Sequence, residues 1–313
     1  MKLIERILSV FHKNYPLEKR DAVWNNCMEK AMQSELNEAN LENMYETNLI
    51  YGFGNRTGGM EEVVALAKAV GICGIDNPEN NAFFGHYVSP PVNLEHLSLK
   101  EILDKIQEKL SFRIEFPTFT GNCSRDLQTE QYGVLTDRYI HYLWVLDRVM
   151  ELCPDRNSSI IEVGAGFGVL GYYLDKAGYR DYTTVDLALV NACQTYFLAK
   201  NLPNRDIILS GDVPDPFDPQ HKYEIKLLHA NDFCNVPSRR FDIMVNIDGL
   251  TEYGIEQASK YVQSDCADML LSINHEMNPF RVCDIEQSHR KRAYRYPFWL
   301  RDGYVEELYR SAE

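Results

Sequence analysis

The segment from Glu162 to Gly168 carries the residues best suited to chemistry. It reads Glu-Val-Gly-Ala-Gly-Phe-Gly, it follows the apolar run 159–163, and it precedes a helical pattern. Glycines let the backbone run close beneath a ligand, and the first N–H groups of the following helix are free to meet that ligand. Asp186 ends the next predicted strand, about 20 residues on, where an acid can accept hydrogen bonds from both hydroxyls of a ribose. The spacing predicts a site for a nucleoside-containing cofactor.

Two kinds of nucleoside cofactor fit a glycine turn of this outline. The dinucleotide fingerprint G-x-G-x-x-G needs glycine or alanine at position 169, whereas the sequence has Val169 and its third glycine comes one residue early. A carboxylate at Glu162 would repel a pyrophosphate and suits a cofactor that ends in a cationic amino acid. S-adenosylmethionine has such an end and no phosphate, so it is the predicted cofactor. An NAD-dependent oxidoreductase is the less favoured alternative.

The same turn resembles the first motif of class I S-adenosylmethionine-dependent methyltransferases. Asp186 matches the acid that ends their second strand, and residues 241–248 resemble their fourth-strand motif. Asp232 resembles the position that holds the adenine amino group, although a simple loop acid is an equal alternative there. The resemblance covers about residues 155–313 and implies a Rossmann-like fold. It implies cofactor contacts at Glu162, Gly164, Ala165, Gly166, Gly168, Asp186, Leu187, Asp232 and Asn246.

Two stretches, 241–253 and 296–309, resemble the sugar O-methyltransferase family related to nanchangmycin biosynthesis. The resemblance implies a sugar or nucleotide sugar as substrate and its hydroxyl as the methyl acceptor. Residues 246–249 read Asn-Ile-Asp-Gly and lack the Pro-Pro-Tyr typical of amino-methylating DNA enzymes, which favours oxygen methylation. A natural-product or other small-molecule O-methyltransferase is the nearest alternative. A non-catalytic protein that binds a partner through its helical half is a further one.

Polar residues end two of the predicted strands, at 246–248 and at 274–276. Ligands of open α/β sheets bind outside the carboxyl ends of the strands, so these side chains are expected to converge near the methyl acceptor. Aromatic faces suit sugar rings, and arginine suits phosphate. The predicted substrate contacts are Asn274, Arg295 and Tyr296.

A sugar hydroxyl is weakly acidic, so its methylation benefits from a positioned base. His275 is the first choice because its unperturbed pKa lies near neutrality, although a structural histidine paired with a carboxylate fits equally well. Asp248 and Glu252 are the second choices. The three side chains also suit a Mg²⁺ ion that would acidify the hydroxyl. Nothing in their spacing requires a metal, so none is predicted.

Residue periodicity assigns these groups to two regions. Residues 1–125 are predicted to be mainly helical and to cap the substrate pocket, whereas 126–313 form the cofactor-binding domain. The fold class is α/β, a Rossmann-like class I methyltransferase sheet with a helical N-terminal domain, because strands alternate with helices in the second region. The clearest helices are predicted at 16–49, 60–70, 97–110, 127–152, 169–177, 187–199 and 254–265. The strands are predicted at 159–163, 182–186, 225–229, 241–247, 268–273, 295–300 and 303–309, with an insertion loop at 201–222.

Charge and composition limit which classes of substrate and partner are expected. The formal net charge is −14 and no extended basic run is present, so nucleic acid is not an expected substrate. No stretch approaches the roughly 18 apolar residues of a membrane span, and the apolar start of the chain is broken by Glu5 and Arg6. The eight cysteines form no C-x-x-C pair and suit a reducing compartment. A cytoplasmic enzyme with a small-molecule substrate is expected, and a homo-oligomer is compatible with the sequence.

Overall fold

The computed structural model describes residues 2–14, 36–42, 60–70, 97–117, 128–129, 133–134 and 137–312. Most of the helical stretch predicted at 16–49 lies outside these residues. Among the described residues, no helix combines the length and apolar character needed to cross a bilayer.

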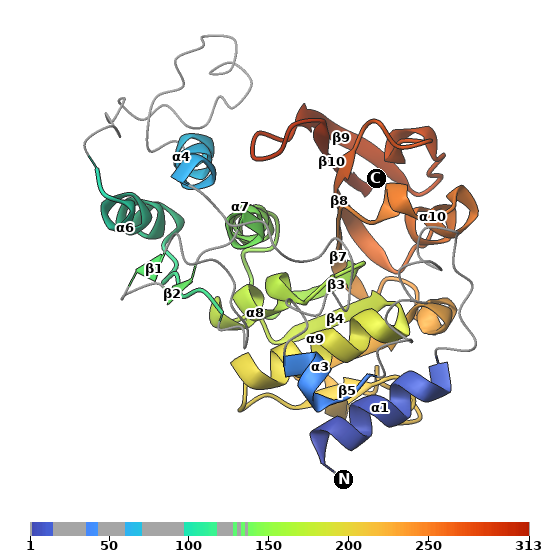
Figure 1. Ribbon diagram of the computed structural model, residues 1–313. Helices are drawn as coiled ribbons and strands as arrows, with labels where there is room; N and C mark the ends of the chain where they lie inside the picture. Colours follow the sequence, from blue (N-terminus) through green and yellow to red (C-terminus); the bar gives the residue numbers. More distant parts are fainter. Residues whose placement is uncertain are drawn as a thin grey trace.

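An eight-stranded sheet is the centre of the molecule (Figure 1). Its strand order is β5-β6-β4-β3-β7-β8-β10-β9. The first six strands in this order, β5, β6, β4, β3, β7 and β8, run parallel. β10 is antiparallel to both of its neighbours, β8 and β9. The bounds are β3 (Ser159–Val163), β4 (Asp181–Asp186), β5 (Ile207–Leu209), β6 (Ile225–His229), β7 (Phe241–Ile247), β8 (Ala267–His275), β9 (Arg290–Pro297) and β10 (Tyr304–Ser311).

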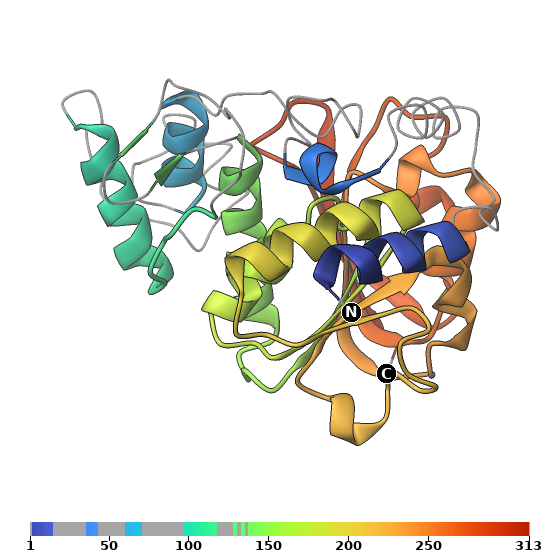
Figure 2. The ribbon, with the colours of Figure 1, turned by 60° about the horizontal axis from the view of Figure 1, so that its bottom comes forward.

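The helices cover the sheet on both faces. One face packs against α1, α7, α8 and α9, and the other packs against α10 (Figures 1 and 2). Alternation along β3 divides its side chains between the two layers, with Ile160 in the first core and Ile161 in the second. The bounds are α1 (Leu3–Asn14), α3 (Glu38–Glu42), α4 (Met60–Ala69), α6 (Leu99–Leu110), α7 (Asp137–Leu152), α8 (Val169–Lys176), α9 (Ala188–Asn201) and α10 (Ile255–Val262).

The first helix belongs to the layer that covers the sheet. α1 lies alongside α9, and its side chains Ile7 and Phe11 are buried there (Figure 2). Arg6 donates to the carbonyl of Ile207 and to Asp212, just beyond β5. The helices α4 and α6 pack against each other, and α4 also contacts α7. A capping box at Ser98 and Glu101 fixes the start of α6, as its sequence favours.

Three segments differ from their predicted form. The helix predicted at 127–152 begins only at Asp137, and it is preceded by the short paired strands β1 (Gln128–Thr129) and β2 (Gly133–Val134). The predicted insertion loop at 201–222 contains β5, a three-residue edge strand. The last hairpin begins earlier than predicted, because β9 covers Arg290–Pro297. The remaining strands agree with prediction to within two residues at each end.

The order of the parallel strands reverses between β3 and β7. β4 and β6 follow on one side of β3, whereas β7 and β8 follow on the other. Such a switch point leaves a crevice outside the carboxyl ends of the strands, where ligands of open α/β sheets bind. The predicted α/β fold of Rossmann-like type is confirmed, and the glycine turn lies at this switch point.

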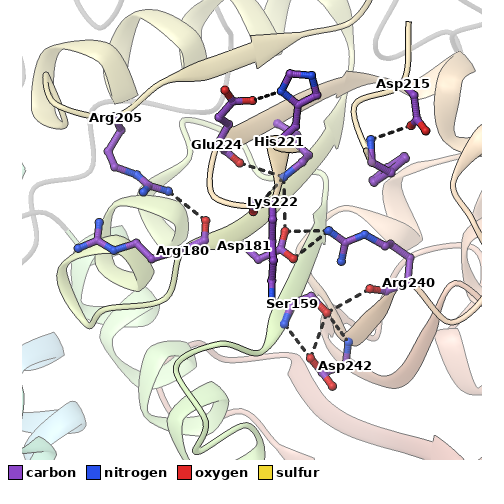
Figure 3. Close-up of polar contacts among 12 residues, drawn as sticks. Ser159, Arg180, Asp181, Arg205, Asp215, His221, Lys222, Glu224, Arg240 and Asp242 are labelled. Carbon is purple, nitrogen blue, oxygen red and sulfur yellow. Dashed lines mark hydrogen bonds and ion pairs between the residues drawn. The ribbon is translucent and has the colours of Figure 1, made fainter. Parts of the chain in front are cut away.

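Buried ion pairs tie together the opposite, amino-terminal ends of the strands (Figure 3). Asp181 accepts hydrogen bonds from Arg240 at 2.8 and 3.0 Å and from Lys226 at 3.4 Å. Lys226 is fully buried and also donates to two carbonyls, at 3.1 and 3.3 Å. Burial lowers the pKa of the Lys226 ammonium. Since all of its donors are used, this cluster is a structural clamp on β4, β6 and β7.

Candidate functional site

The turn after β3 has a backbone that favours glycine. Gly164, Gly166 and Gly168 have φ angles of +72°, +56° and +80°, a region that side chains disfavour. The N–H of Gly164 donates to the carbonyl of Val185 at 2.9 Å, which joins the turn to the end of β4. α8 begins directly afterwards at Val169. The predicted glycine positions therefore form a tight turn at the switch point.

Glu162 lies beneath this turn and is fully buried. One carboxylate oxygen accepts a hydrogen bond from the hydroxyl of Tyr182. The other oxygen, Oε1, has no partner among the described residues. Burial raises the pKa of Glu162 to about 8, against the opposing effect of the Tyr182 hydroxyl. A buried carboxylate oxygen without a partner fits a cationic ligand, which would supply the missing interaction.

Gly171 makes room for the tyrosine that holds Glu162. A Cβ atom at Gly171 would collide with the ring of Tyr182. Tyr182 is itself almost fully buried, so its ring has no space to retreat. Sequence reasoning missed Tyr182 and Gly171, because neither belongs to the glycine pattern.

Asp186 is held by backbone and side-chain donors at the end of β4. It is 6% exposed, and it accepts from the N–H groups of Gly166 at 3.2 Å and Leu187 at 2.8 Å. Gln194 on α9 adds a third hydrogen bond at 3.1 Å. The hydrogen bonds from Gly166 and Gln194 both end on Oδ2, whereas that from Leu187 ends on Oδ1. Leu187 is the N-cap of α9, and Ala165 is fully buried inside the turn.

Asp232 lies beyond the end of β6, within the 3-10 helix Ala230–Asn235. It is partly buried. His229, the last residue of β6, pairs in register with Asp186 on β4. The two acids therefore belong to neighbouring strand ends at the same edge of the sheet.

Asn246 and Asn274 connect three strand ends to one another. Asn246 donates to the carbonyl of Val163 at 2.7 Å and accepts from the N–H of Leu250 at 3.1 Å. Asn274 donates to Asn246 at 2.8 Å and to Ser272 at 2.8 Å. Both asparagines are buried. These hydrogen bonds fix the shape of the switch point, which is an orienting role rather than the proton-transfer role of a base.

Asp248 and His275 lie on adjacent strand ends, β7 and β8. Asp248 has φ +58°, and its carboxylate accepts from Arg301 at 2.5 Å and from the hydroxyl of Tyr304 at 2.6 Å. The ring of His275 contacts that of Tyr304 edge-on, with centroids 4.9 Å apart. We call this group the strand-end cluster; it comprises Asp248, Arg301, Tyr304 and His275. Sequence reasoning missed Arg301 and Tyr304, which reach the cluster through the β9–β10 hairpin.

The hydrogen bonding of His275 restricts its use as a base. Its Nδ1 accepts the N–H of Met277 at 3.0 Å, so the proton of a neutral ring lies on Nε2. Nε2 faces Gly303, where an added Cβ would lie 2.9 Å away. In this arrangement, the neutral ring has no lone pair directed at a substrate.

The two predicted substrate residues of the C-terminal hairpin point to opposite faces of β9. Arg295 forms ion pairs with Glu276 and with Glu307, the latter at 3.1 Å. Tyr296 is 37% exposed and stacks on Tyr294 with ring centroids 5.0 Å apart. Neighbouring residues of a strand face opposite ways. One pocket on a single face of this strand therefore cannot use both side chains.

Glu252, the last of the predicted bases, is exposed in the turn after β7. Within the described ranges, no group of three or more His, Cys, Asp or Glu side chains is arranged to hold a metal ion.

No protein-family model matches the chain, and no curated protein matches it. The solved structure of PH0226 from Pyrococcus horikoshii OT3 is similar with 12% identity and a TM-score of 0.40, covering 60% of this chain and 94% of that one. Magnesium protoporphyrin IX methyltransferase ChlM from Synechocystis PCC 6803, solved with bound SAM, has 14% identity and a TM-score of 0.36, covering 55% and 80%. Mitomycin 7-O-methyltransferase MmcR has 12% identity and a TM-score of 0.34, covering 56% and 57%.

At such low identities and TM-scores, these similarities assign neither a family nor an activity to this chain. The strand order, the antiparallel β10 and the glycine turn at the switch point are features of the chain itself. They give it a Rossmann-like α/β fold.

Proposed function

We propose that this protein is an S-adenosylmethionine-dependent O-methyltransferase. The observation that carries the proposal is Glu162, a buried carboxylate with one oxygen free of partners under a turn of three glycines. A cationic ligand without phosphate matches that charge and that surface. A pyrophosphate at the same place would meet an acid instead of a donor.

The cofactor would be held by groups of the strand ends. Asp186, at the end of β4, is the proposed contact for the ribose hydroxyls, and Glu162 offers Oε1 to the cationic amino-acid end. Asp232 is the proposed contact for the adenine amino group. The proposed backbone surface beneath the cofactor comprises Gly164, Ala165, Gly166, Gly168 and Leu187, with Asn246 bracing it.

When bound, S-adenosylmethionine supplies an electrophilic methyl group. The protein must then orient an acceptor hydroxyl and take its proton. We assign the base to Asp248, because its carboxylate retains lone pairs at the end of β7 while His275 faces Gly303. Tyr304 and Arg301 hold that carboxylate in place. The exposed Glu252 and His275 are the alternative bases.

A sugar or nucleotide sugar is the proposed acceptor, on the strength of the sequence resemblance at 241–253 and 296–309. Asn274 would orient it from behind the strand ends, and Arg295 or Tyr296, but not both on one face, would contact it. The cap role of residues 1–125, the cofactor domain at 126–313 and a cytoplasmic location are proposed on the same sequence grounds. Nucleic acid is not a proposed substrate because of the acidic net charge.

Titration calorimetry with S-adenosylmethionine, its demethylated product and NAD tests the cofactor. We expect binding of the first two and none of NAD. Binding of NAD alone would contradict the proposal. Methylation assays against a panel of nucleotide sugars, free sugars and phenolic natural products then test the acceptor class, with transfer to phenols alone favouring the alternative class.

A further inference from the structure

The side chain of Tyr253 enters the glycine turn from the loop that follows β7. A Cβ atom added to Gly164 would lie 2.5 Å from the Tyr253 hydroxyl oxygen. One added to Gly249 would lie 3.1 Å from the same oxygen and 2.8 Å from Nδ2 of Asn246. Two glycines from different loops therefore leave the space that this one hydroxyl occupies.

The backbone explains one of these glycines but not the other. Gly164 has φ +72°, which favours glycine for conformational reasons. Gly249 has φ −125°, which any residue adopts. The lack of a side chain at Gly249 is explained by the atoms that crowd it, which are those of Asn246 and Tyr253.

Aromatic contacts hold the Tyr253 ring in its position. Its ring lies 5.8 Å from that of Tyr261 on α10, and Tyr261 in turn packs edge-on against Phe233 at 4.6 Å. Within the part of the chain that the structure describes, the Tyr253 hydroxyl makes no hydrogen bond. A phenol that is fixed through its ring and has no partner for its oxygen is prepared for a ligand.

The two carboxylates of the turn influence this phenol electrostatically. Burial, and then the charges of Asp186 and Glu162 among its neighbours, hold the pKa of Tyr253 well above its usual value. The group is therefore an intact phenol at neutral pH, with one proton and two lone pairs. The hydroxyl can rotate about its C–O bond, so an oxygen lone pair can be directed at a ligand over Gly164.

We propose that the Tyr253 hydroxyl is a cofactor contact that favours the positively charged sulfonium over the neutral sulfide of the demethylated product. The inference rests on the proposed function, because it assigns the ligand of the same turn. A lone pair stabilises a neighbouring cation and gains little from an uncharged sulfur. The amino-acid end is common to both ligands, so the difference between them isolates the sulfonium.

The test compares the affinities of the Tyr253→Phe protein for S-adenosylmethionine and for its demethylated product, measured by titration calorimetry. We expect binding of S-adenosylmethionine to weaken about tenfold, the loss of one polar contact to a charge, while binding of the product changes less than twofold. Tyr261→Phe is the matched control, since it removes a hydroxyl from the neighbouring ring and should leave the ratio of the two affinities unchanged.

Failure of the inference and failure of the proposed function give different results. An equal loss for both ligands, or no loss for either, in the Tyr253→Phe protein would overturn the inference and leave the proposed function intact. A wild-type protein that binds neither ligand would remove the proposed function and the inference with it.

Discussion

The residue that most distinguishes this site is Glu162. Its carboxyl group is buried, one of its oxygens has no partner, and its pKa is raised to about 8. At pH 7 the ligand-free protein therefore holds this group mostly in its neutral form. A cation bound beside it would favour the charged form, so ligand binding and loss of a proton should be coupled.

This coupling predicts a pH-dependent affinity. Below pH 8, the affinity for S-adenosylmethionine should rise by nearly tenfold per pH unit, and it should level off above that pH. Calorimetry in buffers of different ionisation enthalpy, from pH 6 to 9, measures the released proton directly. Glu162→Gln should bind weakly with no such slope, and an unchanged slope in that variant would assign the proton to another group.

The same group predicts how the stability of the ligand-free protein changes with pH. The folded-state pKa of Glu162 lies above its usual value of 4.5, so its favourable contribution is complete below about pH 4.5 and is lost as pH rises through 8. The free energy of unfolding, relative to Glu162→Gln, should therefore fall between pH 5 and pH 8. Urea denaturation of both proteins at several pH values measures this difference, and a rising difference would show that the carboxylate is stabilised when folded.

The strand-end cluster predicts that two substitutions differ in effect. Asp248→Asn should lower kcat by about 10²–10⁴-fold, because it removes the assigned base. His275→Gln should lower kcat much less, since Nδ1 of His275 is already occupied by the N–H of Met277. Steady-state kinetics of methyl transfer measures both, with cofactor affinity as the control. A larger loss in the histidine variant would return the role of base to His275.

At the scale of elements, the contact between α8 and β4 supports the site. The ring of Tyr182 on β4 lies against Gly171 of α8, and its hydroxyl holds Glu162 of β3. Three elements are thus joined through one tyrosine. A substitution at Gly171 of α8 should therefore alter the proposed cofactor site, although this residue would not contact the ligand.

Gly171→Ala tests this connection. The new methyl group would collide with Tyr182, so we expect a loss of about 1–3 kcal/mol in the free energy of unfolding, together with weaker cofactor binding. Chemical denaturation and calorimetry measure the two effects. Gly254→Ala is the control, because no atom lies within 4 Å of a Cβ at that position. Equal effects of the two substitutions would contradict the argument.

Local patterns predicted most of these elements and the acids at their ends. The strand at 159–163 and the strands at 225–229 and 241–247 are apolar runs bounded by turns, so periodicity was sufficient. β5 was missed, since three apolar residues in a loop-like sequence give no period. Tyr253 was not assigned a role, because its position at Gly164 depends on contacts between loops that are distant in sequence. The opposite facing of Arg295 and Tyr296 could have been predicted, since the strand expected at 295–300 already contained both residues.

At the scale of the whole molecule, the two ends of the parallel strands serve different purposes. The glycine turn and the strand-end cluster lie at their carboxyl ends, whereas the buried ion pairs of Asp181 lie at their amino ends (Figure 3). A substitution at the amino ends should therefore change the free energy of unfolding without changing ligand binding.

Asp181→Asn should show this separation. It removes the partner of the buried Lys226 and of Arg240, so we expect a loss of about 3–5 kcal/mol in the free energy of unfolding. The affinity of the folded protein for S-adenosylmethionine should change little. Arg281→Ala removes an exposed ion pair with Asp284 and should change the free energy of unfolding much less. Denaturation and calorimetry at one temperature compare the two variants, and a large fall in affinity for Asp181→Asn would link the two ends.

The docking of α1 on α9 has a practical consequence for producing this protein. Ile7 and Phe11 are shielded there, and Arg6 is tied to Ile207 and Asp212 across the sheet edge. A shortened chain that starts after residue 14 would expose the apolar surface of α9 that α1 covers. It would also lose the hydrogen bonds from Arg6 to the edge strand β5 and to Asp212. Such a fragment would be prone to self-association, so affinity tags are better attached at the other terminus.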